Sequence, residues 1–134
     1  MAELNKRAPR VLIVDDEESI RTFAARALRE AGYDVVVASH GPDALAIAEQ
    51  SGPFDLYLID LLMPQMRGDE VARRLRRADP GVKILYFTGY SDSLFNEKKM
   101  LWQNEAFVEK PVSLNGLLEA ASLSLFGHTR GLDK

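Results

Sequence analysis

Val11-Leu12-Ile13-Val14-Asp15-Asp16-Glu17-Glu18 is the stretch that decides the fold of this chain, because four apolar residues are followed at once by four acids. A short apolar run without alternation is typical of a strand buried on both faces, as the strands of parallel sheets are. The acids suit the start of a helix, where the helix dipole favours negative charge. The stretch therefore predicts a central parallel strand that leads through an acidic turn into a helix.

The same alternation of strand and helix repeats along the rest of the chain. Further strands are predicted at 35–38, 54–59, 82–87 and 106–108, and helices at 20–31, 41–51, 71–78, 91–102 and 113–125. Such alternation favours an α/β fold with one doubly wound, five-stranded parallel sheet and helices on both faces. We choose the flavodoxin-like strand order 2-1-3-4-5, which the periodicity alone does not fix.

Two helices show most clearly which face they should bury. The apolar spacing predicts that the following side chains pack on the sheet: Ile20, Phe23, Ala24, Ala27, Leu28 and Ala31 in the first helix, and Leu114, Leu117, Leu118, Ala121 and Leu125 in the last. Ser113 is expected to cap the last helix, and Gly32 to end the first.

Composition narrows the classes of function. The chain has 134 residues, of which 46% are hydrophobic, and this fits one ordinary domain with a real core. Its formal charge of -3 argues against a nucleic-acid partner. It has no cysteine, which excludes disulfides and thiolate chemistry. There is no signal peptide and no apolar run of membrane-spanning length, so we expect a cytoplasmic protein without a membrane partner.

Chemically useful residues stand where the predicted strands end. Asp15 and Asp16 follow the first strand, Asp60 the third, Thr88 the fourth and Lys110 the fifth. Ligands of open α/β sheets bind outside the carboxyl ends of the strands. In the chosen strand order, we expect all five side chains to meet at that edge.

Three neighbouring carboxylates repel one another, and a hard divalent cation relieves the repulsion. Magnesium prefers oxygen ligands and keeps some waters, so Mg²⁺ bound by carboxylates and a phosphoryl group fits these residues. Lys110 adds a second positive charge, and aspartate is an established covalent acceptor of phosphoryl groups. Each residue alone has an ordinary explanation as a cap, a turn or a strand end; the combination at the right strand ends predicts phosphoryl transfer.

Four motifs together resemble the receiver domain of response regulators. They are Val11–Glu17, Leu58–Pro64, Phe87–Gly89 and Glu109–Pro111. The resemblance covers residues 9–126, with a polar leader at 1–8 and a polar tail at 127–134. It implies a CheY-like module of two-component signalling.

The resemblance also implies a role for each site residue. Asp60 matches the phosphoacceptor, and Lys110 the cation that contacts the phosphoryl oxygens. Asp16, Asp60 and the backbone carbonyl of Leu62 match direct Mg²⁺ ligands, and Asp15 a ligand acting through water. The Lys110–Pro111 bond matches a cis-proline of the family.

Further residues match family positions that govern the output and the lifetime of the phosphorylated state. Thr88 matches the hydroxyl that moves onto the phosphoryl group, and Phe107 an aromatic that swings inward with it. Leu62 and Tyr90 stand at positions that tune self-dephosphorylation in the family. The resemblance thus implies a switch in a partner-binding face made by the fourth helix (91–102), the fifth strand and the fifth helix.

As a receiver, the chain would take its phosphoryl group from a histidine kinase or a phosphotransfer protein, and would catalyse at most its own phosphorylation and dephosphorylation. A weak homodimer on phosphorylation is also implied. Whether the chain is a stand-alone receiver or a module of a hybrid histidine kinase or a longer regulator stays open.

Three rival interpretations fit the sequence less well. A phosphohydrolase of the haloacid-dehalogenase type needs an acid two residues after its nucleophile, where this chain has Leu62. A nucleotide- or flavin-binding domain needs a glycine-rich loop after the first strand, where four acids stand here. A pseudo-receiver scaffold should have lost the acid pair or the lysine, and all are present.

Overall fold

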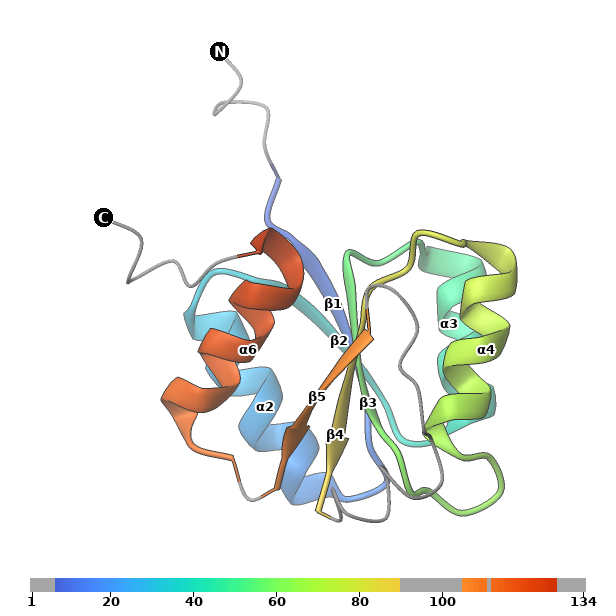
Figure 1. Cartoon of the computed structure of the whole chain (residues 1–134), viewed down its shortest axis with the longest axis horizontal. Helices are drawn as coiled ribbons and strands as arrows, with labels where there is room; N and C mark the ends of the chain where they lie inside the picture. The colour runs from blue at the N-terminus through green and yellow to red at the C-terminus, as the bar shows by residue number, and fades with distance from the viewer. Residues whose placement is uncertain (1–6, 90–104, 111, 128–134) are drawn as a thin grey trace.

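A parallel sheet of five strands forms the centre of the protein (Figure 1). The computed structural model describes residues 7–89, 105–110 and 112–127. The strands are β1 (Arg10–Val14), β2 (Asp34–Ala38), β3 (Leu56–Asp60), β4 (Ile84–Thr88) and β5 (Glu105–Glu109). Their order across the sheet is β2-β1-β3-β4-β5, and every neighbouring pair is parallel. The predicted strand order is confirmed.

Helices cover both faces of this sheet, as the alternation predicted. They are α2 (Glu18–Glu30), α3 (Gly41–Ser51), α4 (Gly68–Ala78) and α6 (Leu114–Phe126). Figure 1 shows α2 and α6 on one face and α3 and α4 on the other. The helix predicted at 91–102 lies outside the described residues. Across the described ranges, none of the helices has the length and apolar character needed to cross a membrane.

Burial follows the position of each strand in the sheet. Every residue of β3 and β4 is buried, because these strands have neighbours on both sides and helices on both faces. The edge strand β2 leaves Val37 37% exposed. Alternate side chains of the strands feed two separate apolar clusters, one under α2 and α6 and one under α3 and α4. The sheet is therefore held rigidly from both sides.

Local sequence signals explain where the helices begin and end. The Ser113 hydroxyl accepts a hydrogen bond from the Gly116 backbone N–H at 2.9 Å, which caps α6 as predicted. The imidazole of His40 accepts one from the Asp43 N–H at 3.2 Å and caps α3. Beyond the end of α2, Gly32 has a φ of 101°, a conformation that glycine adopts without strain.

Three side chains expected to face the sheet are exposed instead. Phe23 is 37% exposed, Leu114 is 51% exposed, and Ala31 also lies at the surface. In α2 the buried side chains include those of Ala24, Ala25 and Ala27, which pack toward the sheet, whereas Phe23 lies at the edge of this contact. Phe23 and Leu114 line a shallow surface groove together. The prediction that these side chains are buried was wrong, because a helical period of 3.6 shows which face of a helix is apolar but not how deeply each side chain on that face is buried.

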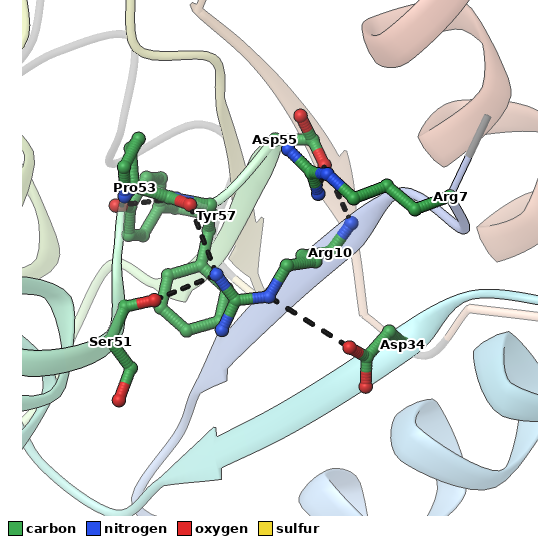
Figure 2. Close-up of polar contacts among 8 residues, drawn as sticks. Arg7, Arg10, Asp34, Ser51, Pro53, Asp55 and Tyr57 are labelled. Atoms are coloured by element: carbon green, nitrogen blue, oxygen red, sulfur yellow. Dashed lines mark hydrogen bonds and ion pairs between the residues drawn. The ribbon is translucent and has the colours of Figure 1, made fainter. Parts of the chain in front are cut away.

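An arginine clamp ties the amino ends of β1 and β3 to the loop after α3 (Figure 2). The Arg10 guanidinium donates to the backbone oxygens of Ser51 at 2.7 Å and Pro53 at 3.3 Å, and its carbon lies 4.3 Å from the centre of the Phe54 ring. The Arg10 backbone N–H donates to the Asp55 carboxylate at 2.7 Å. These contacts fix the end of the sheet opposite to the acidic strand ends.

Candidate functional site

The carboxyl ends of four strands bring the predicted site residues together. Asp15 directly follows β1, Asp60 ends β3, Thr88 ends β4 and Lys110 directly follows β5. Asp16 comes next after Asp15, in the turn before α2. Because the strands are parallel and β1, β3, β4 and β5 are consecutive in the sheet, these residues share one edge. The convergence expected from the strand order is therefore observed.

Three carboxylates form the centre of this edge. One carboxylate oxygen from each of Asp15, Asp16 and Asp60 lies within 4.8 Å of the others. Asp15 is 0% and Asp60 5% exposed, while Asp16 is open to solvent. The Asp15 Oδ2 atom is buried and accepts no hydrogen bond of good geometry from the described residues, although the Lys110 ammonium lies 3.0 Å away. An under-coordinated buried oxygen beside two other carboxylates fits a site for a hard cation.

Backbone contacts hold Asp15 in place. Its Oδ1 atom accepts a hydrogen bond from the Glu17 backbone N–H at 2.9 Å, and its own backbone N–H donates to the Ala38 carbonyl at 3.2 Å. The Arg21 guanidinium donates to the Asp15 backbone oxygen at 2.7 Å. One carboxylate oxygen is thus committed to the turn, which leaves Oδ2 directed at the cluster.

Lys110 lies among the acids. Its Nζ atom is 3.0 Å from Asp15 Oδ2, 3.3 Å from Glu17 Oε1 and 3.6 Å from Asp60 Oδ2. The backbone N–H of Lys110 donates to the Thr88 carbonyl at 2.6 Å, which fixes the start of the side chain. Burial alone would lower the pKa of Lys110, but contact with Asp15 and the nearby acids raise it above its usual value. The lysine therefore stays charged.

The two buried acids are harder to ionise than ordinary aspartates. Burial, followed by the negative charge of Asp15, raises the pKa of Asp60 to about 7, although the charge of Lys110 acts in the opposite direction. Burial also raises the pKa of Asp15, against the lowering effects of the Glu17 N–H and of Lys110. One lysine does not neutralise three carboxylates, so the site favours an additional positive charge.

A glycine lets α4 begin directly beside the phosphoacceptor candidate. The Gly68 N–H donates to the Leu61 carbonyl at 2.7 Å. A Cβ atom at Gly68 would overlap the backbone oxygen of Asp60 and press on the Ile59 side chain. The loop of residues 61–67 therefore folds back tightly on the end of β3, where Asp60 lies.

The acids open to solvent through a cavity of about 450 Å³. Its walls are Asp16, Glu17, Asp60, Leu62, Thr88, Gly89 and Lys110. Leu62 is 38% exposed at this opening. A larger hollow of about 900 Å³ lies at the opposite end of the sheet, among the loops beside the arginine clamp. Of these two cavities, the smaller one is lined by two acids of the cluster, Asp16 and Asp60, and by Lys110, and the larger one by none of them.

The two residues expected to form a switch lie on neighbouring strands. Thr88 is 1% exposed and lines the cavity. Phe107 is partly buried, pairs in register with Tyr86 of β4 and packs on the apolar cluster beneath α3 and α4. Tyr90 and the Lys110–Pro111 peptide bond fall outside the described residues, so the expectations for them stay predictions.

The sequence interpretation assigned no function to Glu17. Its contact with Lys110 joins residues 93 positions apart, so no local pattern reveals it. The signal that could have drawn attention to Glu17 is its place directly after the aspartate pair, in a run of four acids.

Comparison with known proteins agrees with this geometry. Residues 11–122 match the model of the response regulator receiver domain family. The sensor kinase CckA of Brucella abortus (strain 2308) is 36% identical over 108 residues, which are 80% of this chain and 11% of that protein. The receiver protein CpdR of the same organism is 34% identical over 109 residues, which are 81% of this chain and 90% of that protein.

Solved structures lead to the same family. The response regulator TrrA of Thermotoga maritima, solved in complex with Mg²⁺-BeF, has a TM-score of 0.76 and 33% identity, and the match covers 87% of this chain and 99% of that one. The family model spans most of the chain, and its fold is the one seen in this solved relative. The chain belongs to the family of response regulator receiver domains.

Proposed function

We propose that Asp60 is the residue on which this receiver domain accepts its phosphoryl group. The observation that carries the proposal is the position of its carboxylate, which is buried at the bottom of an open cavity with the Lys110 ammonium 3.6 Å away. A carboxylate oxygen of Asp60 would form the new bond to phosphorus while the bond to the donor breaks. The leaving group keeps the electron pair of the broken bond.

The acid cluster supports a magnesium ion as the cofactor. Asp15, Asp16 and Asp60, together with the backbone carbonyl of Leu62, would hold Mg²⁺, with Asp15 acting through water. The bound ion would supply positive charge beside the phosphoryl oxygens. The buried, under-coordinated Oδ2 of Asp15 and the Mg²⁺-BeF complex of TrrA both favour this assignment. Lys110 would hold a phosphoryl oxygen by a charge-assisted contact.

Receiver domains interact with histidine kinases or phosphotransfer proteins, and we propose such a protein as the donor for this chain. The chain itself would not be a classical enzyme, because the group it receives stays on its own side chain until water removes it. A downstream protein would bind the face formed by the helix predicted at 91–102, β5 and α6. Phosphorylation would also favour a weak homodimer of this chain.

Thr88 and Phe107 would connect the site to that face. Thr88 lines the cavity, and Phe107 lies on the adjacent strand β5, where it is only partly buried. If the hydroxyl moves onto a phosphoryl oxygen, Phe107 can move into the space that it leaves. Such coupling requires only that phosphorylation favours one of two existing arrangements.

Leu62 and Tyr90 would lengthen the life of the phosphorylated state. Hydrolysis of an acyl phosphate needs a water in line with the phosphorus, and an unpositioned water loses the advantage of orientation. Leu62 lines the cavity and offers no hydrogen bond to such a water. The double variant Leu62→Asn/Tyr90→Glu should therefore lose its phosphoryl group faster than the wild type.

The experiment that tests the function is phosphorylation by a small-molecule donor, read by intact mass. With Mg²⁺ we expect one phosphoryl adduct on the wild type, no adduct on Asp60→Asn, and an unchanged adduct on the exposed control Asp55→Asn. An equal yield in Asp60→Asn, or in excess chelator, would exclude this function of Asp60.

A further inference from the structure

Glu17 lies at the mouth of the cavity and contacts the lysine inside it. Its Oε1 atom is 3.3 Å from the Lys110 Nζ atom, and its side chain is 59% exposed. The same ammonium is 3.0 Å from Asp15 and 3.6 Å from Asp60. Glu17 therefore shares the Lys110 ammonium with the two buried acids, and it is nearer to that ammonium than the proposed phosphoacceptor is.

The contact is not explained by the stability of α2. Glu17 occupies the N-cap position of this helix, yet its side chain makes no capping hydrogen bond. Its backbone N–H fixes the turn by donating to Asp15 Oδ1, a contact that any residue except proline can make at this position. An acid at this position also suits the helix dipole, but that effect needs no contact with Lys110. Because an ion pair at an exposed carboxylate contributes little to folding, the contact with Lys110 acts mainly on the charge of the site.

The charge of Glu17 acts on an incoming phosphodonor in two ways. A negative donor that enters the cavity passes a carboxylate on its wall and is repelled. The donor must also compete with Glu17 for the Lys110 ammonium. Both effects grow with the negative charge of the donor and weaken as salt screens them.

We propose that Glu17 determines which phosphodonors the site accepts, by holding down transfer from small, doubly negative donors. The proposal rests on the proposed phosphorylation of Asp60. A phosphohistidine on a partner protein gains binding energy from contacts outside the cavity, and these contacts offset the repulsion at its mouth. Acetyl phosphate has no such contacts, so its reaction rate reports the full effect of the carboxylate.

The test compares two donors and two matched variants. Acetyl phosphate is doubly negative at neutral pH, and phosphoramidate carries one negative charge fewer. Glu17→Gln removes the charge that contacts Lys110. Glu18→Gln removes the same charge one residue further on, from an exposed acid that makes no ion pair with Lys110 within the described structure. Rates of phosphorylation are measured at saturating Mg²⁺, determined separately for each variant.

For Glu17→Gln we expect the rate with acetyl phosphate to rise about five-fold at an ionic strength of about 0.01 M and about two-fold at about 0.15 M, taking a separation of roughly 7 Å in water. With phosphoramidate at the lower salt we expect only about a two-fold rise, because the donor carries less charge. Glu18→Gln should change these rates by much less.

The inference is wrong if Glu17→Gln reacts like the wild type, if both donors gain by the same factor, or if Glu18→Gln gains as much as Glu17→Gln. Each of these outcomes leaves the proposed function intact as long as the wild type is labelled. If the wild type is not labelled on Asp60 by either donor, it is the proposed function that fails.

Discussion

Replacement of Asp60 by asparagine should stabilise the metal-free protein at neutral pH, although it removes the proposed phosphoacceptor. Asp60 is 5% exposed and its carboxyl lies beside Asp15, and these surroundings raise the pKa of that carboxyl from 3.8 to about 7. The folded state therefore holds a proton in a pH range where the unfolded chain has already lost it. As the pH rises from about 4 to about 7, the free energy of unfolding falls, because only the unfolded chain carries the ionised carboxylate; above the folded pKa both states are ionised and the fall ends.

The size of the effect follows from the two pKa values. A rise from 3.8 to about 7 corresponds to at most about 4 kcal/mol between the protonated and ionised forms. Asparagine resembles the protonated acid in size and charge. We therefore expect Asp60→Asn to unfold with a free energy about 1–4 kcal/mol higher than the wild type at pH 8, and with nearly the same free energy at pH 4.

The assay is urea unfolding followed by circular dichroism in excess chelator, repeated between about pH 4 and pH 8. Glu49→Gln, which removes an exposed acid on α3, is the control for the loss of one negative charge. A stability difference that stays constant with pH, or an Asp60→Asn protein less stable than the wild type at pH 8, would show that the folded site does not strain the Asp60 carboxylate.

Three further changes probe the site and its support. Mg²⁺ at 100 times its dissociation constant should raise the free energy of unfolding of the wild type by about 2.7 kcal/mol and that of Asp60→Asn by less. The measurement is thermal unfolding, with KCl of matched ionic strength as the control. Equal gains in the two proteins would show that Asp60 is not a ligand of the metal. Gly68→Ala should lose about 1–3 kcal/mol of unfolding free energy in urea and should be phosphorylated more slowly, because its Cβ would overlap the Asp60 backbone oxygen. The control is Gly81→Ala, whose Cβ would meet only an ordinary contact at 3.7 Å. Equal stability of the two variants would argue against the tight turn. Glu105→Ala should lower the free energy of unfolding by about 3 kcal/mol, because it removes the buried carboxylate that Arg76 of α4 contacts. A loss below about 1 kcal/mol would show that this ion pair does not hold β5 in place.

The sequence by itself determined the elements and the chemistry at their ends. The short apolar run Val11–Val14, bounded by acids, is typical of a strand buried on both faces, and it forms most of β1. Asp15, Asp60, Thr88 and Lys110 could be identified because each stands at a strand end, which is a local property of the chain. The direction of parallel strands then requires that these ends share one edge.

The tertiary structure alone decided the depth, the distances and the charges of these groups. No spacing in the sequence shows that Phe23 lies at the rim of α2, because periodicity gives the direction of a side chain and not what covers it. The contact of Glu17 with Lys110 and the overlap that only glycine avoids at position 68 depend on how separate elements pack. The raised pKa of Asp60 has the same origin, since burial and a neighbouring carboxylate arise only when the strands are assembled.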